Sequence, residues 1–461
     1  MSESVTTTRF APSPPGGLHL GNARTALFSY LHAKSAEGRF LLRIEDTDTA
    51  RSDPGHVEAL QRELRWLGLE WDDEPLLQSR RADVYEEYLA RLLENGRVYP
   101  CWRTDEELAA FRRAAAAAGR PPIYDREWGR LPPEEISRRG AAGQRPVMRF
   151  RVPDSGEVVF DDLVRGEQRT PVRAIGDFVV QRSDGTTPFF FSNAVDDATG
   201  GITDVLRGED HLSNTARQYL LLDALGLTPP RYGHLPLVVD DGGLPLSKRR
   251  GALTLSALAD DGLLPAAMLN YLARLGHAIE SGELLTLAAL ADGFEPARIG
   301  RAPAHFDPAQ LAHWQHLAVQ ACGADELVSW AGPTAFASVP AAERERFVAA
   351  VRANVERPDD FRHWAAIVYG DSLPATGAAA PAAAERPVIE AAAASLGQGV
   401  SDLRGLAAAI TAATGARGRT LYRPLRLALT GREQGPELGP LLELMGPERA
   451  RRRLAAPAGD S

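Results

Sequence analysis

The sequence of 461 residues predicts a multidomain protein in which an α/β part is followed by an all-α part. The length is more than one hydrophobic core normally serves, so roughly two to four domains are expected. Short apolar runs alternate with stretches of helical spacing over residues 1–96, and this alternation returns over 191–250. After about residue 250 almost every segment has helical spacing, which predicts an all-helical end.

Composition and charge are those of an ordinary globular protein. Hydrophobic residues make up 44% and charged residues 25% of the chain, a balance typical of proteins with substantial cores. The formal net charge of -9 does not favour a polyanion as partner. It does not exclude one, because local basic faces decide nucleic-acid binding more than the sum does.

Targeting and redox signals are absent from the sequence pattern. No apolar run approaches the roughly 18 residues that a membrane-spanning helix needs, and MSESVTTTRF has neither the basic start nor the apolar stretch of a secretory signal. Cys101 and Cys322 lie far apart and form no CxxC pair. We therefore expect a reduced, cytoplasmic protein without membrane contact.

The first half-domain is predicted to cover residues 1–96 and to begin with a β-α-β unit. A short β-branched strand in VTTTRFA leads through a Pro/Gly loop to a helix that begins at about Asn22. RFLLRIE, residues 39–45, is an apolar strand of the kind that is buried in a parallel sheet. Two further helices are expected, one from Pro54 and one from Val84 that stops before Gly96.

Four further segments are predicted after this half-domain. Residues 97–190 carry an Arg/Ala helix (104–118) and short strands around VMRFRV, EVVFDDLV and DFVVQRSDG, which indicates an α+β insertion. The α/β pattern resumes over 191–250, with a helix at 215–225 and a strand in HLPLVV. Helical segments then cover 251–310 and 311–461, and the low-complexity stretch 373–395 is predicted to be a hinge between two helical subdomains.

A glycine-rich loop lies in RFAPSPPGGLHLGNARTALFSYL, residues 9–31. The first N–H groups of the helix that follows lack internal partners, and its dipole end is positive, so such a loop is suited to bind phosphate. Gly16, Gly17 and Gly21 would let a large anion approach the backbone. His19 could donate a hydrogen bond to a phosphate oxygen as charge develops there. Considered alone, however, the loop is better explained by a tight turn with an incidental histidine.

A second candidate is GLPLSKRRG, residues 243–251, where Lys248, Arg249 and Arg250 follow Ser247 on a glycine-flanked loop. A basic loop just beyond the last strand of the α/β part could close over a pyrophosphate. A solvated basic turn explains this loop as well when it is considered alone. The two loops together, at opposite ends of a split α/β domain, favour a phosphate site.

A third candidate is a set of charged residues at predicted strand ends. Arg9 and Ser13 flank the end of the first strand, Glu45 ends the second, and Arg207 ends a later one. Ligands of open parallel sheets bind at the carboxyl ends of the strands. Arginines grip carboxylates and a carboxylate holds an ammonium group, so an acidic amino acid would suit the set. Surface salt bridges are the alternative for each residue taken singly.

Ordered motifs extend this pattern along nearly the whole chain. His19-Leu20-Gly21-Asn22 matches the HIGH signature at its His and Gly, and residues 245–249 match the KMSKS-type loop at Ser247 and Lys248. RIEDTD, DFVVQRSDG, VDD, GITDVLRGEDHLSNTARQ and HLPL stand between them in order, and LYRPLRLALTGREQGPELGPLLELMG lies near the C-terminus. In these motifs the sequence resembles bacterial glutamyl-tRNA synthetases, which are class I aminoacyl-tRNA synthetases.

The resemblance implies a fold and a reaction. It implies a class I Rossmann-type catalytic domain (1–96 and 191–250) split by an acceptor-stem-binding insertion (97–190). A stem-contact region (251–310) and a helical anticodon-binding domain (311–461) are implied to follow. The implied reaction forms glutamyl-adenylate from L-glutamate and ATP with Mg²⁺, and then transfers glutamyl to the 3′ end of tRNA(Glu). A monomer is expected.

The resemblance also assigns residues by position. The glutamate-binding set is Arg9, Ala11, Ser13, Glu45, Phe189, Asn193 and Arg207. The ATP-binding set is His19, Gly21, Asn22, Asp210, Lys248 and Arg249. His19, Gly21, Ser247 and Lys248 are the residues expected to act in catalysis, mainly by positioning and charge stabilisation.

Three departures from the family pattern stand out. Members that bind zinc carry a Cys-x-Cys pair in the insertion, but here the text is CWR, with Cys101 followed by Arg103. A structural zinc needs about four ligands, so neither zinc nor any other bound metal is expected. Phe189 replaces the tyrosine expected against glutamate, and Pro245 replaces the first lysine of the KMSKS pattern. His313 and His316 are read as packing or surface residues.

Alternatives to a tRNA(Glu)-charging enzyme remain at this point. A non-discriminating enzyme would also glutamylate tRNA(Gln), and the sequence does not identify the residues that read the anticodon. A glutamyl-queuosine tRNA(Asp) synthetase would lack the helical C-terminal portion. An inactive RNA-binding paralogue would be expected to have lost His19, Gly21, Ser247 and Lys248, which are all present. The sequence also does not tell whether glutamate activation requires bound tRNA.

Overall fold

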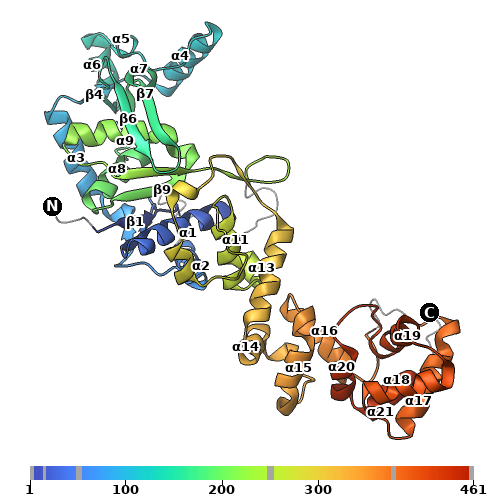
Figure 1. Cartoon of the computed structure of the whole chain (residues 1–461). Helices are drawn as coiled ribbons and strands as arrows, with labels where there is room; N and C mark the ends of the chain where they lie inside the picture. Colours follow the sequence, from blue (N-terminus) through green and yellow to red (C-terminus); the bar gives the residue numbers. More distant parts are fainter. Residues whose placement is uncertain (1–4, 14–16, 48–53, 247–253, 375–380, 456–461) are drawn as a thin grey trace. The chain divides into compact units, whose positions relative to one another are not determined.

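The computed structural model describes residues 5–13, 17–47, 54–246, 254–374 and 381–455. Two compact units share the chain (Figure 1). Unit 1 is formed by Met1–Ala257 and Leu269–Asp307, and unit 2 by Leu258–Met268 and Pro308–Ser461. The predicted segment 251–310 is therefore divided between the units. In the described part of the chain, no helix has both the length and the apolar character needed to cross a membrane.

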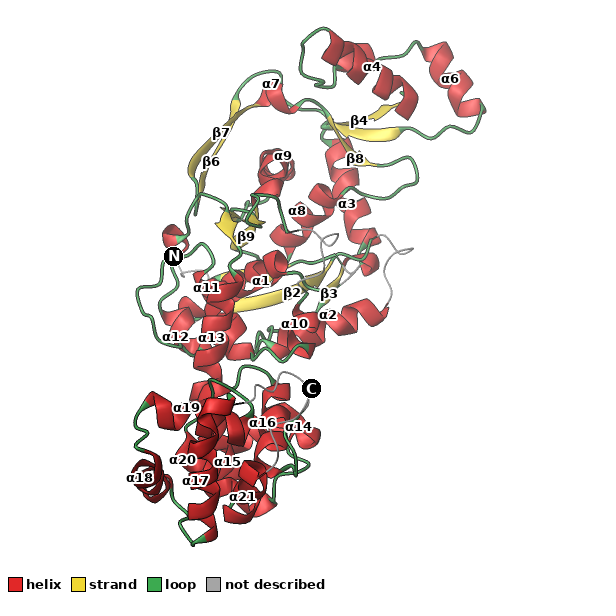
Figure 2. Ribbon diagram, turned by 90° about the vertical axis from the view of Figure 1, so that its right-hand side faces the viewer, coloured by secondary structure: helices red, strands yellow, loops and turns green. Residues whose placement is uncertain are grey.

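Parallel strands form the centre of unit 1, as the β-α-β prediction requires. The strands are β1 (Thr7–Phe10), β2 (Arg39–Ile44) and β3 (Leu76–Leu77) in one sheet, and β9 (Asp204–Gly208) with β10 (Arg231–Leu235) in another. Each neighbouring pair is parallel. The Thr203 N–H donates to the Thr7 carbonyl (2.9 Å), which sets β9 beside β1. The helix α1 (Leu20–Ser35) packs along these strands (Figure 2).

The remaining helices of the first half and the resumed α/β part surround this centre. They are α2 (Pro54–Trp66), α3 (Ala82–Glu94), α8 (Phe189–Thr199) and α9 (Leu212–Leu225), with 3₁₀ turns η1 (Gln78–Arg80) and η2 (Glu209–His211). The positions of α2, α3 and α9 agree with the predicted helices to within a few residues, whereas α8 was not predicted. The predicted strand in HLPLVV is wrong as a single element. It breaks at Pro236, which has no N–H for a ladder, into β10 and the short β11 (Val238–Val239).

Residues 97–190 form antiparallel strands and short helices. The strands are β4 (Val98–Cys101), β5 (Val147–Phe150) and β8 (Phe178–Gln181) in one sheet, and the hairpin β6 (Glu157–Asp162) with β7 (Gly166–Pro171). The helices are α4 (Asp105–Ala117), α5 (Arg126–Gly129), α6 (Pro133–Ala141) and α7 (Val172–Ile175). In Figure 1, α4, α5 and α6 gather around β4, at the opposite end of unit 1 from β1.

The strands of the insertion share a core with the helices that surround the parallel strands. Phe150 and Phe178 of its strands share one buried cluster with Leu92 of α3, Phe191 of α8 and Leu221 of α9. Burial of such side chains contributes roughly 25 cal/mol per Å² of apolar surface.

The end of unit 1 and the whole of unit 2 are mainly helical. Unit 1 ends with part of α11 (Pro265–Arg274), α12 (Leu287–Asp292), η3 (Pro296–Arg298) and β12 (Ala304–His305), which pairs with β11. The helix α10 (Leu255–Asp260) precedes α11. The long helices of unit 2 are α13 (Pro308–Ala321), α14 (Ala324–Ala335), α15 (Arg344–Val351), α16 (Pro358–Tyr369), α17 (Arg386–Gly397), α18 (Leu403–Thr414), α19 (Arg419–Thr430), α20 (Leu438–Met445) and α21 (Pro447–Ala455).

The predicted hinge over 373–395 is wrong in its second half. The helix α17 begins at Arg386 and carries Pro387 in its first turn, a position that tolerates proline. Ala392 of this helix is fully buried among residues of α18, α19 and α21. Alanine has the highest helix propensity and lets helices approach closely, so residues 386–395 of the low-complexity stretch are part of a packed helix.

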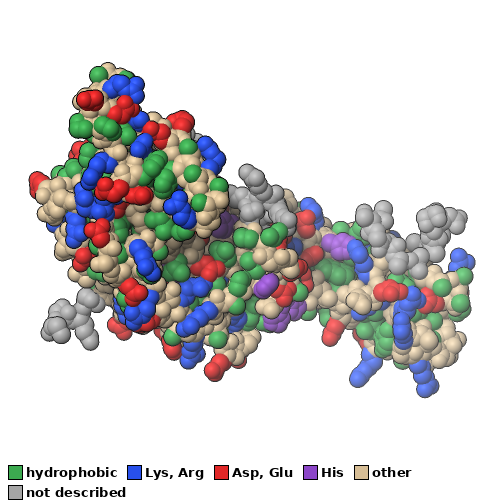
Figure 3. All heavy atoms as spheres, turned by 90° about the horizontal axis from the view of Figure 1, so that it is seen from above, with side chains coloured by type: hydrophobic (Ala, Val, Ile, Leu, Met, Phe, Trp, Pro, Cys, Tyr) green, Lys and Arg blue, Asp and Glu red, His purple; other side chains and the backbone are tan. Residues whose placement is uncertain are grey.

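The surface of the molecule carries charges of both signs. On the face drawn in Figure 3, Lys and Arg side chains are interspersed with Asp and Glu rather than gathered in one field. This mixture agrees with the modest net charge of -9. Long-range electrostatic attraction of a polyanion is therefore a weak guide to function, and the pocket of unit 1 is more informative.

Candidate active site

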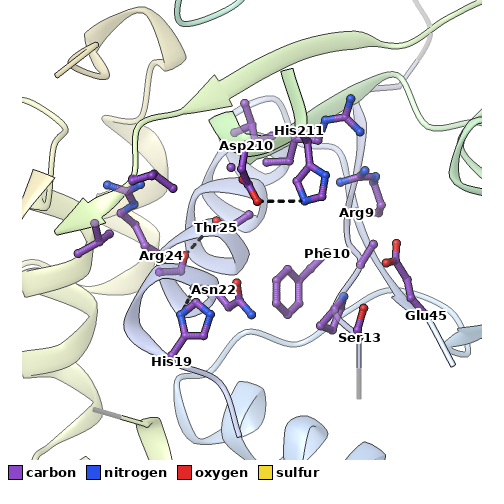
Figure 4. A pocket seen from close by; sticks show the side chains of 18 of the residues that line it. Arg9, Phe10, Ser13, His19, Asn22, Arg24, Thr25, Glu45, Asp210 and His211 are labelled. Atoms are coloured by element: carbon purple, nitrogen blue, oxygen red, sulfur yellow. Dashed lines mark hydrogen bonds and ion pairs between the residues drawn. The ribbon is translucent and has the colours of Figure 1, made fainter. Parts of the chain in front are cut away.

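A pocket of about 550 Å³ opens where β1, β2 and β9 end (Figure 4). Every predicted site residue that the structure describes lines it: Arg9, Ala11, Ser13, His19, Gly21, Asn22, Glu45, Phe189, Asn193, Arg207 and Asp210. Ser247, Lys248 and Arg249 lie outside the described residues. The carboxyl ends of parallel strands are the usual place for a ligand in such sheets, and the structure brings the two predicted sets together there.

His19 caps the helix α1, which begins two residues earlier than predicted, at Leu20. The Nδ1 atom of His19 accepts a hydrogen bond from the Asn22 N–H at 3.3 Å. A neutral imidazole that accepts at Nδ1 carries its proton on Nε2 and donates from there. A Cβ atom on Gly21 would lie 3.3 Å from the His19 ring, so glycine keeps the ring accessible at the positive end of the helix.

The buried carboxylate of Glu63 on α2 holds two backbone segments beside His19. Its Oε2 atom accepts from the Leu18 N–H (2.7 Å) and its Oε1 atom from the Ser256 N–H (3.3 Å). Thr254 forms a β-bridge with His19, and the Leu246 N–H donates to Val238 at the pocket wall (3.1 Å). Leu246 and Thr254, on the two sides of 247–253, are therefore each paired with a residue that lines the pocket.

Arg9, which lines the pocket, and Arg43 share one buried carboxylate. Asp197 is fully buried, and its Oδ1 atom accepts from Arg9 Nε (3.0 Å) and Arg43 Nη1 (2.5 Å). Burial opposes ionisation of Asp197, but the positive charges of Arg43 and Arg9 outweigh it and lower the pKa of the carboxyl. Arg43 also donates to the Asn193 side-chain oxygen. This network fixes the ends of β1 and β2.

Glu45 places a buried carboxylate at the end of β2. Only 8% of the residue is exposed, and its Oε1 atom has no hydrogen bond among the described residues. Arg43 Nη2 lies 3.6 Å from that oxygen. Burial raises the pKa of the Glu45 carboxyl despite the neighbouring arginine. A cation in the pocket would reverse this effect and gain a charge-assisted hydrogen bond.

Arg207 places a buried guanidinium at the end of β9. Its hydrogen-bond acceptors in the described chain are His234, Thr215 and Gln218, none of which is a carboxylate. Its Nη1 atom is buried without any such partner in the described residues. Burial lowers the pKa of Arg207 to about 10, which leaves it charged at neutral pH. A buried charge that lacks a counter-ion is costly, and a ligand carboxylate would supply one.

Phe189 occupies the place predicted for an aromatic contact, at the start of α8 on the pocket wall. Its ring stacks on His211, with the ring centroids 5.0 Å apart and the planes at 27°. Burial lowers the pKa of the His211 imidazole, so the stack presents two neutral rings. The hydroxyl donor of a tyrosine is replaced here by an apolar surface.

Comparisons with known proteins bear on both units. The family described as "tRNA synthetases class I (E and Q), catalytic domain" matches residues 5–313, and an anticodon binding domain matches 324–457. The chain is 49% identical to glutamate–tRNA ligase 1 of Halorhodospira halophila, across 98% of this chain and 97% of that protein. The chain belongs to the glutamate–tRNA ligase family of class I tRNA synthetases.

Further relatives agree with the assignment to this family. Glutamate–tRNA ligase 2 of Alkalilimnicola ehrlichii is 50% identical over 98% of both chains. A crystal structure of a glutamate tRNA ligase from Elizabethkingia meningosepticum, in complex with its amino acid, has a TM-score of 0.85 at 27% identity and covers 98% of each chain. The synthetase thus has a class I catalytic domain with parallel strands and then a largely helical anticodon-binding domain.

The residues around Cys101 do not fit the zinc site that some members of the family carry. The Cys101 sulfur lies 3.1 Å from the Tyr124 hydroxyl. Arg103, at the place of a second cysteine, stacks over the Trp128 ring at 4.4 Å and donates to the Trp128 carbonyl at 2.6 Å. A guanidinium contributes no metal ligand and repels a cation. A cation–π contact and a hydrogen bond join these segments instead.

The purified synthetase is expected to contain no stoichiometric zinc, because Arg103 brings a positive charge to the place where a ligand would be needed. Metal analysis by mass spectrometry after extensive dialysis measures this directly. A zinc content of one per chain would contradict it. The variant Arg103→Cys serves as the matched control, since it restores a sulfur ligand beside Cys101 without restoring the full set.

The remaining histidines and cysteines in the described part of the chain do not form a metal-binding cluster. In the described ranges, no group of three or more His, Cys, Asp or Glu side chains could hold a metal ion. His313 is exposed on α13, and its ring lies 5.3 Å from that of Trp314. The interpretation of His313 as a surface residue therefore agrees with its position.

Sequence reasoning missed several residues of this site. Arg43, Asp197, Thr25, His211 and His234 line the pocket or hold its walls. For Arg43 a signal existed, because a charged residue in the apolar strand RFLLRIE has to find a buried partner. For Asp197 the motif VDD was noted without a role. His234 begins the motif HLPL, which was likewise noted without a role, and its partner Asp162 lies far away in the sequence.

Proposed function

We propose that this synthetase is a glutamate–tRNA ligase that activates L-glutamate with ATP and charges tRNA(Glu) for protein synthesis. In the first step a carboxylate oxygen of glutamate attacks the α-phosphorus of ATP, and pyrophosphate leaves. In the second step a ribose hydroxyl of the terminal tRNA adenosine attacks the glutamyl carbonyl, and AMP leaves. The name of each curated relative above supports the same activity.

The observation that carries this proposal is a pair of buried charged groups in one pocket, each with one polar atom that has no hydrogen bond among the described residues. Glu45 offers a carboxylate oxygen to an ammonium group, and Arg207 offers a guanidinium nitrogen to a carboxylate. A substrate with both groups would repay the burial of both charges. Phe189 would cover the aliphatic part of such a substrate, and Arg9, Ala11, Ser13 and Asn193 complete the proposed glutamate site.

The nucleotide is proposed to bind at the other side of the pocket, around the N-terminus of α1. His19, Gly21 and Asn22 present N–H donors and the positive end of the helix dipole to phosphates. Asp210 lies at the pocket rim. Lys248 and Arg249, with Ser247, are proposed to steady the charge on the α-phosphate, and Mg²⁺ enters as part of the ATP substrate. Positioning and electrostatic stabilisation then account for the rate, since no covalent protein intermediate is needed.

We infer that the other segments bind tRNA as the family resemblance implies. The catalytic domain is proposed to be of Rossmann type, with the insertion 97–190 on the acceptor stem. Residues 251–310 would contact the stem, and the helical end of the chain, from 311 on, would read the anticodon. The family match over 324–457 to an anticodon binding domain supports this, and it disfavours a queuosine-modifying enzyme, which would lack that part.

Parallel charging assays test the proposed function. Purified tRNA(Glu) and tRNA(Gln) are each incubated with the full chain, labelled glutamate and ATP, and acid-precipitable label is counted. Charging of tRNA(Glu) is expected, and charging of neither tRNA would overturn the proposal. Charging of both would establish the non-discriminating alternative.

Lys248→Ala is expected to slow adenylate formation by about 10²- to 10³-fold, the usual cost of losing one preorganised stabilising charge. Glutamate binding should change little, because the proposed contacts of Lys248 are to ATP. Single-turnover kinetics with tRNA(Glu) present measure the rate, and Arg250→Ala is the matched control from the same loop. An unchanged single-turnover rate would remove Lys248 from the proposed machinery.

A further inference from the structure

A buried histidine and aspartate lie directly behind Arg207. His234 is on β10, Asp162 ends β6 of the insertion, and both side chains are fully buried. The His234 Nδ1 atom lies 2.5 Å from Asp162 Oδ2. Neither residue lines the pocket. The pair contacts the pocket lining through Arg207.

The hydrogen bonds of Asp162 fix which of its oxygens meets His234. The Oδ1 atom accepts three backbone N–H groups, from Val164 (3.0 Å), Arg165 (2.9 Å) and His234 itself (3.1 Å). Burial opposes ionisation of Asp162, but the bond from His234 and these N–H groups lower its pKa. The ionised Oδ2 atom can only accept, so the His234 Nδ1 atom has to carry the proton.

The other ring nitrogen of His234 consequently accepts. Arg207 Nε donates to His234 Nε2 at 3.3 Å, and the Thr215 hydroxyl lies 2.8 Å from the same atom. The Arg207 Nη2 atom donates to Thr215 Oγ1 (2.6 Å) and to Gln218 Oε1 (2.7 Å). Burial lowers the pKa of His234, so the ring is neutral. Uncharged acceptors thus hold two nitrogens of the guanidinium and leave Nη1 for a ligand.

We propose that Asp162 and His234 are positioning residues for glutamate recognition: Asp162 fixes the tautomer of His234, and His234 Nε2 holds the Arg207 guanidinium towards the substrate carboxylate. This inference rests on the proposed function of the pocket. It assigns to the insertion a part in amino-acid recognition, because β6 supplies Asp162. The Leu163 N–H donates to the Tyr232 carbonyl (2.8 Å) and fixes β6 against β10 at this point.

The chemistry of the arrangement explains why a histidine stands there. A carboxylate placed directly against Arg207 would neutralise it and compete with the substrate carboxylate. Arg9 and Arg43 differ in this respect, because the carboxylate of Asp197 compensates their charge. A neutral imidazole orients the guanidinium without compensating its charge. His234 lies between Asp162 and Arg207, so Asp162 fixes the proton on His234 Nδ1 without contacting the guanidinium itself.

The variant Asp162→Asn tests the proposal with an isosteric change. Its carbonyl oxygen has to stay with the three backbone N–H groups, so its amide N–H faces His234 Nδ1. The His234 ring would then carry its proton on Nε2, so that this N–H would face the Arg207 Nε–H and could no longer accept a hydrogen bond from it. We expect KM for glutamate to rise by about 10- to 100-fold, the effect of losing a hydrogen bond to a charged group. KM for ATP and kcat at saturating glutamate should change by less than about threefold.

A control and a spectroscopic measurement separate positioning from mere stability. Asp161→Asn alters the exposed neighbour in β6 and should leave both KM values unchanged. Nitrogen-15 spectra of histidine-labelled protein should show the His234 proton on Nδ1 in the parent and on Nε2 in Asp162→Asn, with His234→Gln assigning the signal. A parent ring protonated on Nε2, or an unchanged glutamate KM in Asp162→Asn, would overturn the proposal.

A second pair of variants decides the matter if Asp162→Asn does not fold. His234→Gln retains an acceptor for Arg207 and a donor for Asp162, whereas His234→Leu retains neither. The glutamate KM should rise at least about tenfold more in His234→Leu than in His234→Gln. Equal values would overturn the proposal. Failure of the parent protein to glutamylate any tRNA would instead overturn the proposed function.

Discussion

Arg207→Gln is expected to lower kcat/KM for glutamate by roughly 10²- to 10³-fold, because losing one partner of a buried charge pair costs about 3–4 kcal/mol. Glutamine keeps hydrogen-bonding groups for Thr215 and His234 but brings no charge to the substrate carboxylate. KM for ATP should change by less than about threefold, since the nucleotide is proposed to bind at the α1 side of the pocket. Aminoacylation of tRNA(Glu) at varied glutamate and ATP measures both constants.

An exposed arginine on β2 is the control for this change. Arg39 at the start of β2 forms an ion pair with Asp73 in which both side chains are largely exposed. Arg39→Gln should leave kcat/KM within about twofold, because exposed pairs contribute little. Equal effects of the two substitutions would show that Arg207 does not bind the substrate. Thermal unfolding of both variants checks that the fold is retained.

The residues of the pocket that lie at strand ends and in the loop around His19 were predictable from local sequence, whereas Ala11, Phe189, Asn193 and Asp210 were assigned only by the family resemblance. Arg9 and Arg207 lie in short strands and Glu45 directly follows the apolar strand β2, and parallel strands bring their carboxyl ends to one edge. The start of α1 was misplaced by two residues because histidine is not among the usual capping residues. Its ring nitrogen nevertheless accepts from Asn22 as a capping oxygen would.

The buried charges were not predictable, because their partners are distant in the sequence. Arg43 and Asp197 are 154 residues apart, and Asp162 and His234 are 72 residues apart. A single sequence indicates that a charge in an apolar strand needs a partner, but it does not identify that partner. The same limit applies to the insertion, whose core residues pack against α3, α8 and α9. Pairings across such distances are set by tertiary packing alone.

Asp197→Asn is expected to lower the free energy of unfolding by about 3–5 kcal/mol, the cost of removing one partner from a buried ion network. The substitution leaves the guanidinium groups of Arg9 and Arg43 buried with one amide oxygen between them. The midpoint of thermal unfolding should fall by roughly 5–15 °C in a domain of this size. Differential scanning calorimetry measures the change. Asp73→Asn, which disturbs only the exposed pair with Arg39, should shift the midpoint by about 2 °C or less.

The pH dependence of the difference in unfolding free energy between the parent protein and Asp197→Asn identifies the cause of that difference. The folded protein holds the pKa of Asp197 below its ordinary value, so this carboxylate stabilises the fold above the unfolded pKa of about 4. That contribution is lost as the pH falls below about 4, because the unfolded chain then gains a proton that the folded state resists. The gap between the parent and Asp197→Asn should therefore be constant near neutrality and narrow towards acid. A gap that stays constant down to pH 3 would mean that lost packing, rather than the lost charge, destabilises the variant.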